Sequence, residues 1–197
     1  MCLVLLAVMM VALPARVARA ERACVPAPGA RFTQLSALGA WEVGQIARLR
    51  PDGPARLYQG RCGLDCAAGI AQPRPAWDVD MQASAEALIL TLSAGGRTAG
   101  TLRLAWPQDY EWFGVDTDLS GRAGSSGSSG SGFYAEMRFL GALEGSGDFA
   151  AAAGQPAELV LSGFGNACIT SRSFSGWMLS VEGPKARFRL FGRLHGG

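Results

Sequence analysis

Short segments in which apolar and polar residues alternate recur along most of this chain, and they constrain its fold more than any other feature. In the clearest one, residues 77–82, the apolar positions are Trp77, Val79 and Met81, and the residues between them are polar. A period of two is typical of a strand that buries one face. The pattern therefore favours β structure with one solvated face.

Nine further segments have the length and composition of short strands, with turn residues between them at fairly regular spacing. They are Trp41–Leu49, Arg56–Gln59, Leu88–Leu92, Thr101–Trp106, Tyr110–Val115, Phe133–Leu143, Glu158–Ser162, Phe174–Val181 and Arg187–Leu194. Ahead of them, Arg31 to Leu38 predicts a short helical turn that Gly39 closes. The series predicts an all-β fold: a single antiparallel β-barrel of about 8–10 strands, with a β-sandwich as the alternative.

The first 20 residues predict a signal peptide. Leu3 to Leu13 is an unbroken apolar run of 11 residues, which is too short to cross a bilayer. Ala18 and Ala20 place small residues before a cleavage site ahead of Glu21. We therefore expect a periplasmic or secreted protein, with no transmembrane segment in the mature chain.

The charge balance argues against nucleic acid as a partner. Subtracting Arg16 and Arg19 of the leader from the 18 basic residues leaves 16, equal to the 16 acidic residues. A neutral chain lacks the long-range field that attracts nucleic acid or an anionic membrane. The sequence pattern gives no indication of the oligomeric state.

Residues 21–197 are predicted to form a single β domain. Within it, residues 121–132 are rich in serine and glycine and predict a flexible loop. As a hairpin tip such a loop costs little, because loop-closure entropy grows only logarithmically with length. A domain boundary is the alternative, although the segments on either side are alike in their β pattern.

Four cysteines remain after the leader: Cys24, Cys62, Cys66 and Cys168. An even number in an exported chain predicts two disulfides, with three connectivities open. Cys62 and Cys66 pair with each other, or each joins one of the distant cysteines. A zinc site is the rival interpretation, but the one histidine, His195, lies at the end of the chain.

Residues Gly39, Ala40 and Trp41 follow the expected helical turn and open the expected first strand. This triplet resembles the Gly-x-Trp start of lipocalins and related calycin barrels. The resemblance implies an up-and-down barrel around a ligand cavity, with Trp41 near one end.

The segment from Gly145 to Gly154 is similar to the Gly-x-Gly-x-Phe-x-x-Ala-x-Gly turn of dirigent and allene-oxide-cyclase-like secreted barrels. Its glycines permit a tight turn. Phe149 is expected to point inward, and the small alanines to let strands pass closely. This resemblance also implies a small barrel and transfers no catalytic residue.

Four aromatic residues within eight positions form the candidate ligand site: Trp106, Tyr110, Trp112 and Phe113. Exposed rings beside acidic residues suit a sugar-binding platform, and barrel packing is the alternative interpretation. Strand alternation places Tyr110 and Trp112 on one side and Phe113 on the other. With Trp41, the residues Trp106, Tyr110 and Trp112 are the predicted ligand contacts.

A weak calcium motif follows these rings. Asp116, Asp118 and Ser120 resemble the first half of a calcium loop, although the bidentate carboxylate of such loops is missing.

Earlier in the chain, Asp78 and Asp80 share a strand face at a spacing of about 7 Å. That spacing suits paired carboxylates in catalysis, but a solvated face explains it more simply.

Arg187, Arg189 and Arg193 share a face of the last strand, interrupted by Phe191. An anionic ligand can use such a row, although a solvated face that discourages edge pairing is the simpler explanation. A Ser–His or Cys–His site would depend on His195 in a mobile tail. No catalytic residue and no cofactor are therefore predicted.

Together these features predict an exported, non-enzymatic binding protein for a small, partly apolar or carbohydrate ligand. The alternative is a structural or protein-interaction module of the cell envelope, such as an inhibitor or assembly component, with a filled barrel. A barrel enzyme that uses Asp78 and Asp80 is a third hypothesis. Inward-facing polar residues favour the first or third hypothesis, and a wholly apolar interior favours the second.

Overall fold

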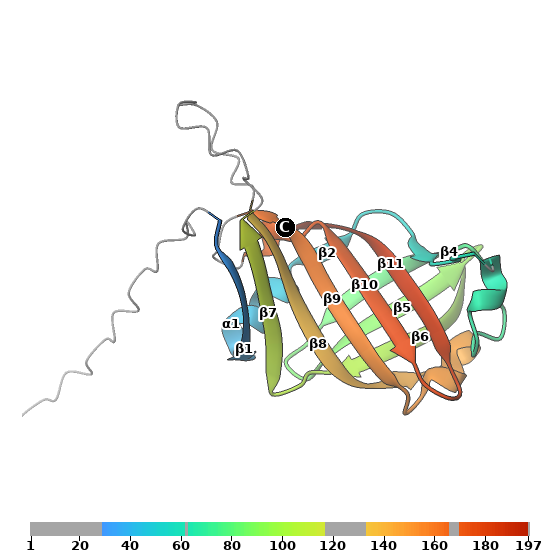
Figure 1. The fold of residues 1–197 in the computed structure, drawn as a ribbon. Helices are drawn as coiled ribbons and strands as arrows, with labels where there is room; N and C mark the ends of the chain where they lie inside the picture. Colours follow the sequence, from blue (N-terminus) through green and yellow to red (C-terminus); the bar gives the residue numbers. More distant parts are fainter. Residues whose placement is uncertain (1–28, 62, 117–132, 166–169, 197) are drawn as a thin grey trace, which may run out of the picture.

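The fold is a closed antiparallel β-barrel, as the alternating pattern predicts (Figure 1). The computed structural model describes residues 29–61, 63–116, 133–165 and 170–196. Eight strands close in the order β8–β6–β5–β4–β3–β11–β10–β9, and β9 pairs with β8. Their bounds are β3 Ala55–Leu57, β4 Ala76–Ala83, β5 Ala87–Ala94, β6 Arg97–Ala105, β8 Phe133–Gly145, β9 Pro156–Gly165, β10 Gly176–Glu182 and β11 Arg187–Gly196.

Three more strands extend this barrel. The first half of β8 pairs with β7 (Asp109–Asp116), whose other edge pairs with β1 (Arg31–Ala37). The second half of β8 pairs with β6 instead, so the sheet branches along this 13-residue strand. The short strand β2 (Leu49–Pro51) pairs with the end of β11.

Two predictions at the start of the barrel are wrong. Arg31 to Leu38 is not a helical turn, because β1 pairs with β7 along its whole length. Phe32 of β1 packs on Phe133, with 5.8 Å between the ring centroids. Trp41–Leu49 is not a strand, because residues Ala40–Ile46 form helix α1. There Glu42 accepts the backbone N–H of Gly39 at the helix start, and Ile46 is buried in the core. The Gly39–Trp41 triplet therefore opens a helix rather than a strand.

The middle of the chain follows the predictions closely. Strands β5 and β6 form the expected hairpin, and its turn places Gly95 and Gly96 at φ +57° and +75°. Asp116 lies opposite Phe133, so the strands on either side of residues 117–132 are paired. That serine- and glycine-rich segment, and the predicted signal peptide, lie outside the described residues. Among the residues described, no helix has the length and apolar character that membrane crossing requires.

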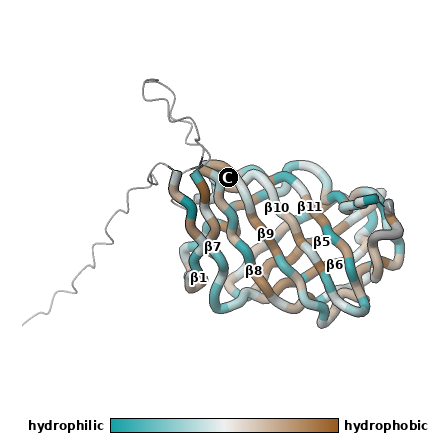
Figure 2. The backbone as a smooth tube through the Cα atoms, in the orientation of Figure 1, coloured by the Kyte–Doolittle hydropathy of each residue, from teal (hydrophilic) through white to brown (hydrophobic). Residues whose placement is uncertain are grey.

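The barrel interior is apolar. Its buried cluster takes large side chains from every strand of the barrel, and hydrophilic residues alternate with them along the wall (Figure 2). Buried polar side chains of the described part are Gln155, Ser171, Ser173 and Ser180. Gln155 accepts the backbone N–H of Lys185 beside a turn, and Ser180 accepts the Arg189 guanidinium on the outer wall. The polar groups thus lie at the margins of the core.

The Gly145–Gly154 segment has the local structure predicted for it. It contains the 3-10 helix η2 (Gly147–Ala152) at one end of the barrel, and this helix inserts Phe149 between Trp77 and Phe188. Gly147 has φ +59°, and a Cβ there would lie 2.2 Å from the carbonyl oxygen of Ala99. Glycine is required at this position by both the backbone angle and the close approach.

Candidate functional site

The interior of the barrel is occupied by side chains. Phe149 is fully buried, with its ring centroid 5.4 Å from that of Trp77 and 5.9 Å from that of Phe188. Leucines from β5, β6, β9 and β11 fill the space around these rings: Leu90, Leu92, Leu102, Leu159 and Leu190. The functional surface is therefore expected on the outer wall.

The predicted aromatic platform is mostly part of the core. Tyr110 and Trp112 are both 4% exposed and share the inner side of β7, while Phe113 lies on the outer side, as predicted. Trp106 is half-buried, and its indole N–H donates to the carbonyl of Ser84 at 2.9 Å. Trp41 is 45% exposed on helix α1. The structure does not bring these residues to one exposed surface.

The polar candidates are separated as well. Asp78 and Asp80 are exposed on the outer face of β4, and Asp80 accepts the Gln82 side-chain amide at 2.7 Å. His195 is not in a loose tail, because it pairs with Arg50 of β2. No carboxylate–histidine pair is formed by these residues.

The predicted metal and disulfide residues are largely outside the described part of the chain. Asp118, Ser120, Cys24, Cys62 and Cys168 all lie there, and the side chain of Cys66 in the 3-10 helix η1 (Gly63–Cys66) is not described either. Asp116 accepts the backbone N–H of Gly29 at 2.8 Å. The described residues contain no group of three or more His, Cys, Asp and Glu side chains that could hold a metal ion. The calcium site and the disulfides stay predictions.

An open groove of about 520 Å³ lies on the outer wall where β3 meets β11. Leu57 lies opposite Leu190 and points inward, whereas Arg56 lies opposite Phe191 and points outward. One position further, the Tyr58 backbone N–H donates to the carbonyl of Arg189. Two aromatic and two arginine side chains therefore alternate in a square on the surface.

Both rings of this square are accessible to solvent. Tyr58 is 55% exposed and Phe191 is 38% exposed. The Arg189 guanidinium lies 5.6 Å from the centroid of the Tyr58 ring, within the range of a cation–π contact. The rest of the lining comes from the chain beside β3: Gln59, Gly60, Arg61 and Pro75. We call the four outward residues Arg56, Tyr58, Arg189 and Phe191, together with this lining, the β3–β11 groove.

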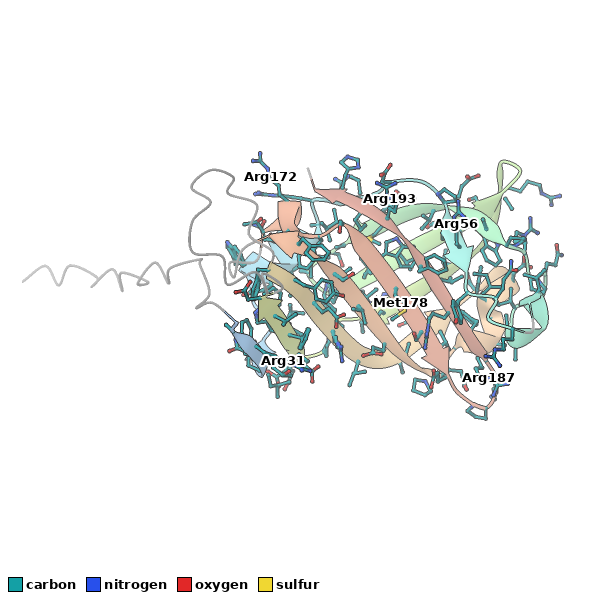
Figure 3. All side chains as sticks on the ribbon, turned by 45° about the horizontal axis from the view of Figure 1, so that its top comes forward. Arg31, Arg56, Arg172, Met178, Arg187 and Arg193 are labelled. Carbon is teal, nitrogen blue, oxygen red and sulfur yellow. The ribbon has the colours of Figure 1, made fainter. Side chains whose placement is uncertain are left out.

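The β3–β11 groove is positively charged. Its lining contains Arg56 and Arg61 and no acidic residue. Neither arginine forms an ion pair within the described part of the chain. Arg189 has a partner, because Glu182 lies 3.8 Å away, but Glu182 is exposed and outside the lining. Figure 3 shows Arg56 on β3 beside β11, with Arg187 and Arg193 towards opposite ends of β11.

A second, smaller groove of about 290 Å³ adjoins the first along the chain. Pro75 lines the β3–β11 groove, and its neighbours Arg74 and Ala76 line the smaller one. The Nε atom of Arg74 and the indole nitrogen of Trp77, also a lining residue, are buried and have no hydrogen-bond partner among the described residues. Both atoms are donors, and the smaller groove is also lined by the exposed carboxylate of Asp78, so it is not purely cationic.

Another outer cluster, on β7, β8 and β9, differs in its charge balance. Phe113, Tyr134 and Phe164 contact one another in sequence, at 6.4 and 5.3 Å between ring centroids. Here Arg138 pairs with both Glu136 and Glu111, which raises the pKa of its guanidinium. Burial, together with the hydrogen bond to Glu136, raises the pKa of Tyr134 to about 12. The charge of Arg138 is thus satisfied within this cluster, and Arg31 lies over the Phe113 ring at 5.7 Å from its centroid.

The sequence analysis missed Arg56, Tyr58 and Arg61. The sequence does contain a repeated pattern, in which an aromatic residue follows an arginine by two positions: Tyr58 follows Arg56, and Phe191 follows Arg189. Only the pairing of β3 with β11 brings the two patterns together.

Comparisons of this chain with protein-family models, with curated proteins and with solved structures gave no match. The lipocalin-like and dirigent-like resemblances therefore stay predictions about local motifs.

Proposed function

We propose that this protein is an exported, non-enzymatic binding protein that recognises its ligand on the outer wall of the barrel, in the β3–β11 groove. The observation that carries the proposal is the contrast between a filled interior and two accessible rings in a groove whose lining arginines, Arg56 and Arg61, form no ion pair among the described residues. Ligand sites combine apolar surface with a few convergent polar groups. The groove has that composition.

The groove is suited to binding rather than to catalysis. Its lining offers guanidinium groups, one amide and one phenol, with no carboxylate, histidine or thiol among the described lining residues. Proton transfer near neutral pH needs a group that titrates there, and guanidinium does not. Flat rings and guanidinium donors suit a carbohydrate or a small, partly apolar ligand.

The test is a glycan and metabolite binding screen with the exported protein and two matched variants. Tyr58→Ala removes an exposed ring from the groove, and Phe164→Ala removes one that is 61% exposed elsewhere on the wall. We expect binding that Tyr58→Ala abolishes and Phe164→Ala preserves. Equal loss in both variants, or a ligand retained inside the barrel, contradicts the proposal.

A second candidate function is that of a protein-interaction module with a filled barrel, which the open edge of β1 favours. In the described part of the chain, β1 pairs only with β7, and Leu35 on it is 74% exposed. Partner strands can add to such an edge. If this function is correct, Leu35→Pro, which removes a backbone N–H that points away from β7, weakens partner binding, whereas Tyr58→Ala does not.

A further inference from the structure

We infer that the ligand of the β3–β11 groove is an acidic oligosaccharide whose sugar rings carry carboxylates, that is, one built from uronic acids. The inference deepens the proposed function and rests on it. It follows from the arrangement of rings and guanidinium groups, from the charge of the groove and from its open shape.

The arrangement alternates in both directions along the wall. Across the strands, Arg56 faces Phe191, and Tyr58 faces Arg189. Neighbours of this kind have Cβ atoms about 5 Å apart, and second neighbours along a strand lie about 7 Å apart. Each ring therefore has an arginine beside it on both strands.

A uronic acid supplies both complementary features within one sugar. The apolar face of its ring stacks on an aromatic side chain, and its carboxylate accepts the fork of N–H groups that arginine presents. Inorganic phosphate matches the arginines alone and leaves Tyr58 and Phe191 unused. A neutral sugar matches the rings alone and leaves the guanidinium groups without an acceptor.

The positive charge of the groove favours an anionic ligand over a neutral or a cationic one. Arg56 and Arg61 form no ion pair among the described residues, and the lining has no acidic side chain to compete with a ligand carboxylate. The Nε atom of Arg74, on the adjoining segment, is buried, and the exposed Asp78 lines the smaller groove beside it. The acidic ligand is therefore confined to the β3–β11 groove.

The same features favour a glycan over a single-stranded nucleic acid, which also combines rings with anions. Nucleic-acid binding draws on an extended positive field. This chain carries 18 basic and 16 acidic residues. On β11, Arg189 and Arg193 are each within 4.0 Å of a carboxylate, Glu182 and Asp52 respectively. The positive region is local and matches a short acidic oligosaccharide.

The experiment is calorimetric titration of the full exported chain with oligosaccharides of galacturonate, glucuronate and mannuronate. Each is paired with its methyl ester, which keeps the rings and removes the charge. The groove variants are Arg56→Gln, Arg61→Gln and Tyr58→Ala. The matched controls are Arg172→Gln, an exposed arginine far from Arg56 in Figure 3, and Phe164→Ala.

We expect at least one acid to bind at least about tenfold more tightly than its ester, and each groove variant to weaken it at least about tenfold, equivalent to about 1.4 kcal/mol. The controls should stay within about twofold. Affinity should fall as salt is raised, since exposed charges are screened. Circular dichroism and urea unfolding establish that each variant is folded.

Three results would overturn the inference. Equal binding of acid and ester that depends on Tyr58 would keep the proposed function and exclude the acidic ligand. Displacement by inorganic phosphate, or tighter binding of a single-stranded oligonucleotide, would assign the groove to a different anion. Failure of every acid and every ester to bind, together with a metabolite bound elsewhere, would exclude both the inference and the proposed function.

Discussion

Strand β11 carries two phenylalanines with opposite surroundings, three positions apart. Phe188 points into the barrel, is 4% exposed and contacts the ring of Phe149. Phe191 points outward, is 38% exposed and lies opposite Arg56. The inner ring contributes to folding by leaving water. The outer ring lies beside arginines on an open groove, where its face is accessible to a ligand.

The comparison shows how this barrel divides its aromatic residues between stability and binding. Inside, rings pack on rings and leucines, and among the described residues the indole nitrogens of Trp77 and Trp177 are buried without a hydrogen-bond partner. Outside, the β3–β11 groove combines exposed rings with Arg56 and Arg61, which form no ion pair among the described residues. Changes inside should therefore affect unfolding, and changes in the groove should affect binding alone.

The largest effect is expected for Phe149→Ala at the end of the barrel. Phe149 is fully buried between Trp77 and Phe188, and its truncation leaves a cavity that should cost about 3–5 kcal/mol. Urea unfolding measures this loss, with Phe164→Ala as the exposed control, expected within about 0.5 kcal/mol of the unaltered protein. Similar losses in both variants would remove the distinction between interior and wall.

The next effect concerns a close backbone contact on β9. A Cβ at Gly163 would lie 1.8 Å from the carbonyl oxygen of Ser173, so Gly163→Ala should destabilise the fold by about 1–3 kcal/mol. Gly44 in helix α1 has nothing within 4 Å of its Cβ position. There the same substitution should stabilise the protein by about 0.5–1 kcal/mol. Thermal unfolding of the two variants should shift in opposite directions.

Alkaline pH should reveal two late-titrating tyrosines, Tyr110 on the inner side of β7 and Tyr134 in the outer cluster. Burial, with a contribution from the charge of Glu42, raises the pKa of Tyr110 to about 12, and Tyr134 has a similarly raised pKa. A raised pKa favours the protonated phenol in the folded state. The resulting stability is present below pH 10 and is lost as pH rises towards 12. In an alkaline titration followed by phenolate absorbance, the variants Tyr110→Phe and Tyr134→Phe should each lose one late-titrating component. Ionisation of either tyrosine near pH 10 would contradict the assignment.

The smallest effect on stability is expected for the groove itself. Arg56→Gln and Tyr58→Ala alter exposed side chains and should change the free energy of unfolding by no more than about 0.5 kcal/mol. Urea unfolding beside the binding titration measures both effects in each variant. A loss above 2 kcal/mol would mean that the groove residues support the fold, and the comparison between the two phenylalanines would no longer hold.

The sequence predicts the barrel where the determining interactions are local. The β5–β6 hairpin depends on Gly95 and Gly96, whose positive φ angles suit the turn between adjacent strands. Alternation along β4 correctly predicts that Trp77 and Met81 are buried and Asp78 and Asp80 exposed, and along β7 it correctly places Tyr110 and Trp112 on one side and Phe113 on the other. The prediction of an inward Phe149 is also confirmed, since glycines shape its turn locally.

Sequence prediction is wrong where distant pairing decides the structure. Arg31–Ala37 is a strand because β7 supplies its hydrogen bonds and Trp112 and Phe133 pack on Phe32. The candidate site depends on distance even more, because Arg56 and Phe191 are 135 positions apart in the chain and adjacent in the sheet. No local sequence pattern contains that contact. The aromatic residues around Trp112 were predicted as ligand contacts instead, because they are close together in the sequence.

The central claim is that the ligand is bound on the outer wall and not inside the barrel. The most direct measurement is nuclear magnetic resonance of the isotope-labelled protein, titrated with the uronic acid oligosaccharide that binds best. The account predicts that backbone amide shifts concentrate at residues 56–61 and 189–191 and at Arg74 and Ala76, which flank Pro75 of the lining. Shifts concentrated at interior positions such as Leu90, Leu102 and Phe188 would contradict it.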